Sequence, residues 1–212
     1  MASTDTDTTE EGQSANDTLR RRIVQTFGGL GVVSFAGAML TPLKGLGIEA
    51  PSGTQQISGQ VLVLAERYQP AGGGEAHEVG APVTRSMMST PDSILTYPQQ
   101  EVDNNHYLIR LHRLSPEEMA EPTNLDQTAD GYVAYSAVCT HLGCTVDWSE
   151  SDHPQTGNPF DICHCHGSEY DPYEGATVLR PPAPRPLPQI GLEINDEDQV
   201  QLTSDFEAKV GP

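Results

Sequence analysis

All four cysteines of this 212-residue chain lie in one stretch, where they stand beside histidines at short spacings. The stretch contains two Cys–His pairs and two further cysteines: Cys139 and His141, Cys163 and His166, and then Cys144 and Cys165. Two thiolates and two neutral imidazoles are a good donor set for a metal. Because zinc and iron–sulfur clusters both accept such donors, the ligand types alone leave the metal open.

The residues around the two pairs resemble the Rieske [2Fe–2S] proteins, specifically the high-potential kind that serve quinol-oxidising cytochrome bc complexes. The first pair opens the segment CTHLGC at Cys139, and the second opens CHCHGSEYD at Cys163. The resemblance is specific because the pairs, the further cysteines and the flanking Gly, Ser and Tyr all agree. A structural Cys2His2 zinc site is the alternative, and it would not need the two further cysteines.

The resemblance implies one [2Fe–2S] cluster, in which Cys139 and Cys163 bind one iron while His141 and His166 bind the other. Two neutral imidazoles in place of two thiolates make the cluster less negative. The reduced state is then easier to reach, so the reduction potential is expected to lie above that of all-cysteine clusters.

Four residues beside the ligands also receive roles from the resemblance. Cys144 and Cys165 are expected to form a disulfide that joins the two ligand segments. Ser168 is expected to donate a hydrogen bond to a bridging sulfide, and Tyr170 to donate one to the sulfur of Cys139. Hydrogen bonds of this kind withdraw charge from the cluster and raise its potential further.

The implied function is electron transfer from a membrane quinol. His141 or His166 would present a ring nitrogen to the quinol, accept its hydrogen bond and take its proton. Leu142, between the first ligands, would pack against a cytochrome b-type membrane subunit. The electron would pass on to an extracytoplasmic cytochrome or copper protein. The alternative is a Rieske electron-transfer subunit of another respiratory enzyme, such as a nitrate reductase-linked Rieske–cytochrome b pair or arsenite oxidase.

Three features depart from the pattern of the bc-type proteins. His164 occupies a position that is commonly proline, and we interpret it as a residue that does not bind metal. Twenty-one residues separate His141 from Cys163, with residues 149–158 as an inserted surface turn. The segment Pro181–Pro184 stands where the family has a proline loop beginning with Gly, and its prolines still predict a stiff cover, since proline fixes φ.

Short alternating apolar runs between turn residues predict an all-β domain over residues 60–212. We expect a Rieske fold: an antiparallel β-sandwich base with an inserted cluster-binding subdomain at about residues 137–185. A short helix is expected at Ser115–Ala120, which has Pro at its first position. The expected strands are 60–66, 82–87, 107–111, 131–137, 145–148, 160–162, 177–179, 189–194 and 199–203.

The first 59 residues predict a membrane anchor and its flanks. Residues 1–22 are polar and end in three arginines, residues 23–43 carry no charge and are long enough for one transmembrane helix, and residues 44–59 form a Gly-rich hinge linker. The arginines place the N-terminus in the cytoplasm and the cluster domain outside the cell membrane. They also resemble a twin-arginine (Tat) export signal. A cleaved signal peptide and a plain spacer are the alternatives.

The chain is strongly acidic, with thirty acidic residues against eleven basic ones and a net charge of −19. Only two of the basic residues are lysines. Such a surface is typical of proteins from organisms that accumulate salt, where screening makes self-repulsion harmless. A basic electron-transfer partner is the other explanation. Nucleic acid binding is not expected, because phosphates would be repelled.

Overall fold

The computed structural model describes residues 57–71 and 73–212, which belong to one unit running from Thr54 to Pro212. The predicted polar N-terminus at 1–22, the transmembrane anchor at 23–43 and most of the hinge at 44–59 lie outside the described residues. In the part that the structure describes, no helix has the length and apolar character of a membrane span.

The described residues form antiparallel β-sheets and three short 3₁₀ turns, without an α-helix among them, so the predicted all-β class is confirmed. The 3₁₀ turns are η2 (Asn105–Tyr107), η3 (Pro116–Glu118) and η4 (Leu125–Gln127). The strands are β1 (Leu62–Leu64), β2 (Asp92–Pro98), β3 (Ile109–Arg113), β4 (Tyr132–Ser136), β5 (Asp147–Ser149), β6 (Phe160–Cys163), β7 (Ser168–Asp171), β8 (Thr177–Arg180), β9 (Gln189–Ile190), β10 (Leu192–Ile194) and β11 (Val200–Leu202).

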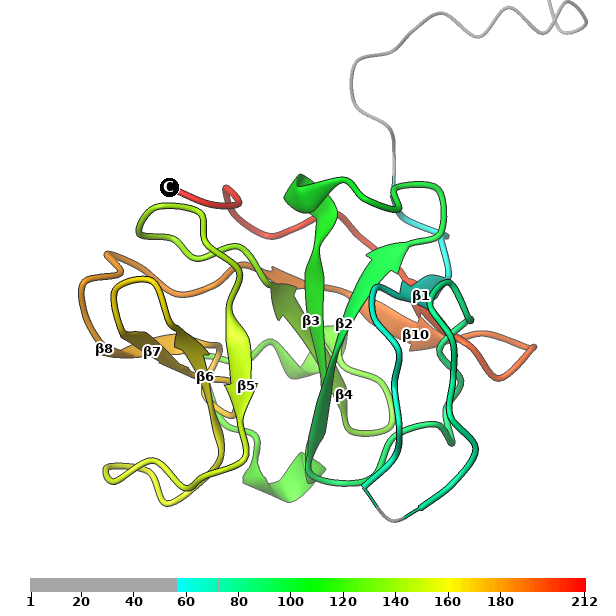
Figure 1. Ribbon diagram of the computed structural model, residues 1–212, viewed down its shortest axis with the longest axis horizontal. Coiled ribbons are helices and arrows are strands. Elements are labelled where there is room, and N and C mark those ends of the chain that lie inside the picture. Colours follow the sequence, from blue (N-terminus) through cyan, green and yellow to red (C-terminus); the bar gives the residue numbers. More distant parts are fainter. Residues whose placement is uncertain (1–56, 72) are drawn as a thin grey trace, which may run out of the picture. The chain divides into compact units, whose positions relative to one another are not determined.

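A five-stranded sheet in the order β1-β2-β3-β4-β9 forms the base of the domain, and its green strands occupy the centre of Figure 1. Every residue of β4 is buried, and successive side chains of a strand point to opposite faces. Tyr132 and Ala134 pack into one apolar core, whereas Val133 and Tyr135 pack into a second. The base sheet therefore lies between two cores, and only the second core contains the cysteines that are predicted to bind metal.

A second sheet, β5-β6-β7-β8, is inserted in the chain between β4 and β9 (Figure 1, yellow to orange). Its strands β6 and β7 form a hairpin in which Cys163 pairs with Ser168. The turn of this hairpin carries the second ligand pair, and the connection from β4 to β5 carries the first. Both predicted ligand segments are thus loops at one end of this inserted sheet.

Several predicted strand assignments were wrong. Residues 82–87 make only two isolated bridges, at Pro82 and Thr84, instead of a strand. The sequence interpretation placed no strand at Asp92–Pro98, yet β2 pairs with both β1 and β3. Prolines at positions 91 and 98 are typical of loops, but both fall at the ends of the strand, where proline does not interrupt the hydrogen bonds of the ladder.

The segment 189–194 is two strands rather than one. β9 pairs with β4, while β10 pairs with β11. Gly191 lies between them, and a methyl group added there would clash with the side-chain hydroxyl of Thr203. The chain therefore changes sheets at a crowded point, where the absence of a side chain leaves room for the hydroxyls of Thr203 and Ser204. The predicted helix at 115–120 is reduced to the 3₁₀ turn η3, because Met119 is already extended.

Candidate metal centre

The first ligand loop, residues 139–144, is a tight turn closed by its own backbone. The Cys139 N–H donates to the Cys144 carbonyl at 2.8 Å, and the Gly143 N–H donates to the Cys139 carbonyl at 3.0 Å. Gly143 has a φ of +81°, in the left-handed region that favours glycine. These contacts bring Cys139, His141 and Cys144 onto one short loop.

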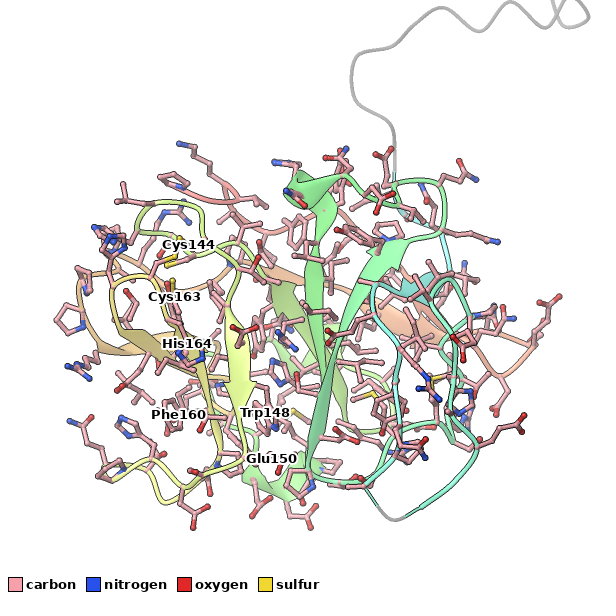
Figure 2. All side chains as sticks on the ribbon, in the orientation of Figure 1. Cys144, Trp148, Glu150, Phe160, Cys163 and His164 are labelled. Carbon is pink, nitrogen blue, oxygen red and sulfur yellow. A yellow bond between two sulfur atoms is a disulfide. The ribbon has the colours of Figure 1, made fainter. Side chains whose placement is uncertain are left out.

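The second ligand loop, residues 163–167, closes in a similar way. The Gly167 N–H donates to the Cys163 carbonyl at 2.9 Å, and Gly167 has a φ of +76°. In Figure 2, Cys144 and Cys163 lie toward one end of the inserted sheet, while Phe160 and Glu150 lie toward the other. The two loops, separated by eighteen residues in sequence, therefore meet at one end of the sheet.

A disulfide between Cys144 and Cys165 joins the two loops. The sulfur atoms of Cys144, Cys163 and Cys165 all lie within 4.8 Å of one another, which is close enough to suggest a metal site. Since two of these sulfurs are bonded to each other, they are not available as thiolate ligands. The free cysteines are Cys139 and Cys163.

The two free thiols are buried, each with 1% of its residue surface exposed. Burial raises the pKa of Cys139, but hydrogen bonds from the Tyr170 hydroxyl and from the His141 backbone N–H outweigh it, and the pKa lies below the ordinary value of cysteine. Burial, and then the hydrogen bond with Cys139, raise the pKa of Cys163. Cys139 is therefore the thiol that gives up its proton first, as a metal ligand must.

The rings of His141 and His166 lie next to each other, with centroids 4.7 Å apart and planes at 86°. Nδ1 of His141 is buried and has no hydrogen-bond partner in the structure. A buried polar nitrogen normally has a partner, and coordination to a metal supplies one. Two buried thiols and this ring nitrogen fit the donor set of a [2Fe–2S] cluster that has mixed thiolate and imidazole ligands.

Ser168 and Tyr170 stand on β7, and both are fully buried. The Ser168 oxygen accepts the Ala183 N–H at 3.0 Å, which leaves its hydroxyl proton available for donation. The Tyr170 oxygen lies 3.2 Å from the sulfur of Cys139. Burial, and then this hydrogen bond with Cys139, raise the pKa of Tyr170. The phenol thus keeps its proton and can donate it toward the sulfur.

Two further residues of the loops point outward. Leu142 is 61% exposed, which is unusual for a leucine and places an apolar side chain at the tip of the first loop. His164 is also exposed, and its Nε2 lies 3.8 Å from a carboxylate oxygen of Asp147. An ion pair of this length between exposed side chains contributes little to stability.

Comparison with known families identifies the class of domain. Residues 111–191 match the Rieske [2Fe-2S] domain, so the chain carries a Rieske domain that holds one [2Fe–2S] cluster. The match begins in β3 and ends between β9 and β10, and it includes both ligand loops. The residues that would hold the cluster are Cys139, His141, Cys163 and His166.

The chain is similar to several known proteins. It is 39% identical over 100 residues to the cytochrome bc1 complex Rieske iron-sulfur subunit of Streptomyces lividans, covering 47% of this chain and 56% of that relative. It is 29% identical over 133 residues to a Haloferax mediterranei protein provisionally named as the Rieske subunit of a respiratory nitrate reductase, covering 63% and 57%. The solved soluble domain of Rieske protein II from Sulfolobus acidocaldarius has 26% identity and a TM-score of 0.37, covering 50% of this chain and 65% of that one.

The structure also brings together buried polar residues that the sequence reasoning missed. His112 on β3 and Asp161 on β6 are both fully buried, and Nε2 of His112 lies 3.1 Å from Asp161 Oδ2. Arg110, also on β3, donates to the Val146 carbonyl at 2.7 Å. The signal in the sequence was the alternation in IRLHR, where Arg110 and His112 share the face opposite Ile109 and Leu111.

Proposed function

We propose that this chain is the electron-transfer subunit of a membrane quinol-oxidising cytochrome bc-type complex. In this role it takes an electron and a proton from quinol and passes the electron to an extracytoplasmic cytochrome or copper protein. It is one component of an oxidoreductase rather than an enzyme alone. The observation that carries the proposal is the tip of the ligand loops, where the exposed His166 and Leu142 lie beside two buried thiols.

Each residue of the tip would have a separate role. The bound cluster supplies a one-electron acceptor. His166 is exposed, so its ring can accept a hydrogen bond from a quinol hydroxyl and hold the proton at a ring nitrogen. His141, which is less exposed, supports the ring of His166 from the side. The exposed side chain of Leu142 supplies an apolar contact for the surface of a cytochrome b-type subunit.

The membrane assignment is part of the same proposal. Residues 23–43 would anchor the chain by one span, with the N-terminus in the cytoplasm and the Rieske domain outside. Export through the twin-arginine pathway would suit a domain whose cluster is inserted before export, and the disulfide fits an oxidising compartment. The Streptomyces relative is named as a subunit of a cytochrome bc1 complex, and its similarity supports this assignment.

A second candidate is the Rieske subunit of a nitrate reductase-linked electron-transfer chain. The Haloferax relative carries that name, and its alignment spans more of this chain than that of the Streptomyces relative. The acidic composition, with a net charge of −19, agrees with a salt-accumulating source. The Rieske subunit of an arsenite oxidase is another candidate of the same kind. Each of these functions uses the same cluster but delivers its electron to a different acceptor.

The test is to purify the full chain from its own membranes with whatever cytochrome copurifies. Quinol oxidation is then measured with a cytochrome, a copper protein or nitrate as the acceptor. The reduced cluster is followed by EPR with and without a quinol-site inhibitor. We expect a b-type cytochrome to copurify and the inhibitor to change the EPR spectrum. A preparation that lacks cytochrome b, or a spectrum that ignores the inhibitor, would contradict the proposal.

Leu142→Ala sharpens this test, and Leu125→Ala is its matched control because Leu125 is also exposed but lies on η4. We expect the Leu142 variant to oxidise quinol more slowly while keeping the potential of the cluster. The Leu125 variant should behave as the unchanged protein. Equal rates for all three chains would remove Leu142 from the docking surface.

A further inference from the structure

The segment Lys209–Pro212 lies against the first ligand loop. Figure 1 draws this end of the chain, in red, beside the yellow-green loop that joins β4 to β5. A methyl group added at Gly211 would lie 3.3 Å from Val138 Cγ1, and one added at Gly143 would lie 3.6 Å from Pro212 Cδ. The segment therefore lies against the residue that precedes the loop, Val138, and against the loop near its end, at Gly143.

Arg185 holds this segment in place. Its Nη1 donates to the Lys209 carbonyl at 2.8 Å, and its Nη2 donates to the Gly211 carbonyl. A guanidinium is a rigid planar group that presents several donors at fixed angles, so it suits two carbonyls that lie two residues apart. A single side chain thereby fixes the segment at two points.

The backbone of Arg185 is tied to the first ligand loop as well. Its carbonyl accepts the hydroxyl of Thr140 at 2.7 Å. Thr140 is 1% exposed and stands between Cys139 and His141 in the sequence. Since threonine has one hydroxyl proton and the carbonyl can only accept, that proton is used on Arg185. The hydroxyl of Tyr170 lies 3.2 Å from the sulfur of Cys139 and 3.4 Å from Thr140 Oγ1, so Thr140 stands next to the group that contacts the ligand sulfur.

We propose that Arg185 is a positioning residue of the metal centre. Its side chain fastens Lys209–Pro212 across the first ligand loop, and its carbonyl fixes Thr140 and with it the backbone between Cys139 and His141. The inference goes beyond the proposed function, because it concerns the geometry of the cluster site whichever electron acceptor the chain serves.

Arg185→Gln tests the proposal, and Arg180→Gln is the matched control. Arg180 ends β8 in the same stretch of chain, but its side chain is exposed and contacts Glu169 at 3.2 Å instead of the Lys209–Pro212 segment. Both variants remove one positive charge from the same connection, so an effect common to both is electrostatic. An effect specific to Arg185→Gln reports positioning.

The measurement is amide hydrogen exchange over residues 138–146 in the full chain with its cluster bound. Because hydrogen bonds from a charged group are among the stronger ones, we expect Arg185→Gln to speed exchange in this loop about tenfold. Exchange in β2 and β3 should stay unchanged. The EPR spectrum of the reduced cluster should also change in this variant, and Arg180→Gln should change neither readout.

A chain shortened by Lys209–Pro212 provides the second test. If Arg185 acts through this segment, the shortened chain should show the same faster exchange, and Arg185→Gln should add little to it. Arg185→Lys keeps the charge but offers one compact ammonium group in place of the guanidinium fork, so its exchange rate should lie between those of the unchanged chain and Arg185→Gln. If Arg185→Gln does not retain its cluster, hydrogen exchange over residues 138–146 can still be compared between the unchanged chain, Arg185→Lys and the shortened chain.

Two results would overturn the proposal. One is unchanged exchange over residues 138–146 in both the shortened chain and the Arg185 variants. The other is fully additive effects of the shortening and of Arg185→Gln, since independent effects mean that the side chain does not act through the segment.

Discussion

The base sheet and the inserted sheet of this domain are stabilised in different ways. In the base, β4 is buried along its whole length, and β3 is buried apart from its last residue. In the inserted sheet, β5 and β8 contain no buried residue, and β6 alternates between buried and half-buried positions. Burial is therefore continuous along β3 and β4 of the base, whereas in the inserted sheet it is concentrated on β7, where Tyr170 is fully buried, and the sheet also needs other contacts.

Those other contacts gather around the ligand loops and beneath the inserted sheet. The disulfide Cys144–Cys165 joins the loops, and Ser168 anchors the proline segment through the Ala183 N–H. His112 Nε2 and Asp161 Oδ2 approach to 3.1 Å between the two sheets, although the contact lacks the geometry of a hydrogen bond. The comparison indicates a rigid base that carries a ligand end fixed mainly by covalent and polar contacts.

The largest effect is expected where the two sheets meet. Asp161→Ala removes one partner of a fully buried pair and leaves His112 without it, so stability should fall by about 3–5 kcal/mol. Replacing both residues, as His112→Phe with Asp161→Leu, should restore much of this loss. Urea unfolding measures both changes, with the exposed Asp126→Ala as control. A single variant as stable as that control would show that the pair does not connect the sheets.

Removing the disulfide should affect mainly the ligand end. Because the bridge closes a loop with a sequence separation of 21, Cys144→Ser with Cys165→Ser should cost about 3 kcal/mol of stability in the inserted sheet. Iron should be lost faster, while hydrogen exchange in β2, β3 and β4 stays slow. Exchange that rises equally in both sheets would mean that the two regions unfold together.

Tyr170→Phe should change the cluster without changing the fold. The variant loses the hydroxyl that lies 3.2 Å from the Cys139 sulfur, so the reduction potential should fall by on the order of 60 mV, a factor of ten for a one-electron couple. Tyr173→Phe is the control, since Tyr173 is also a buried tyrosine of the same core. Equal potentials for the two variants would remove the assigned hydrogen bond.

The smallest effect concerns Asp171, at the end of β7. Burial raises the pKa of this carboxyl in the folded state, so its charge destabilises the fold at pH values above the folded pKa. Below the unfolded pKa the carboxyl is protonated in both states and the effect is absent. Asp171→Asn should therefore be more stable than the unchanged chain at pH 7, and this gain should disappear at acidic pH. A gain that is the same at both pH values would contradict this explanation.

The ligand end was more predictable from the sequence than the base. Side chains that bind a metal must have particular types and close spacings, so CTHLGC and CHCHGSEYD indicate their chemistry directly. The structure brings both loops together, and the family match includes them. The assignment of each ligand to its iron stays a prediction, as do the roles of Ser168 and Tyr170 as donors to the cluster.

The base was harder to predict because its strands lack a clear alternating pattern, although β1 to β4 pair in sequence order. β2 carries proline at its last position and lacks strict alternation, yet it is an interior strand of its sheet because β1 and β3 pair with it. The buried pair of His112 and Asp161 was also missed, since only the folded structure brings β3 and β6 together. Residues 82–87 have strand-forming side chains but make only isolated bridges.

The central claim is that two cysteines and two histidines of this chain hold a two-iron cluster. The most direct test is iron, zinc and acid-labile sulfide analysis of the purified full chain, with pulsed EPR of its reduced form. We predict one [2Fe–2S] cluster per chain and two histidine nitrogens coupled to the reduced iron, of which His141→Cys removes one. Stoichiometric zinc without acid-labile sulfide, or a cluster without coupled histidine nitrogen, would contradict the account.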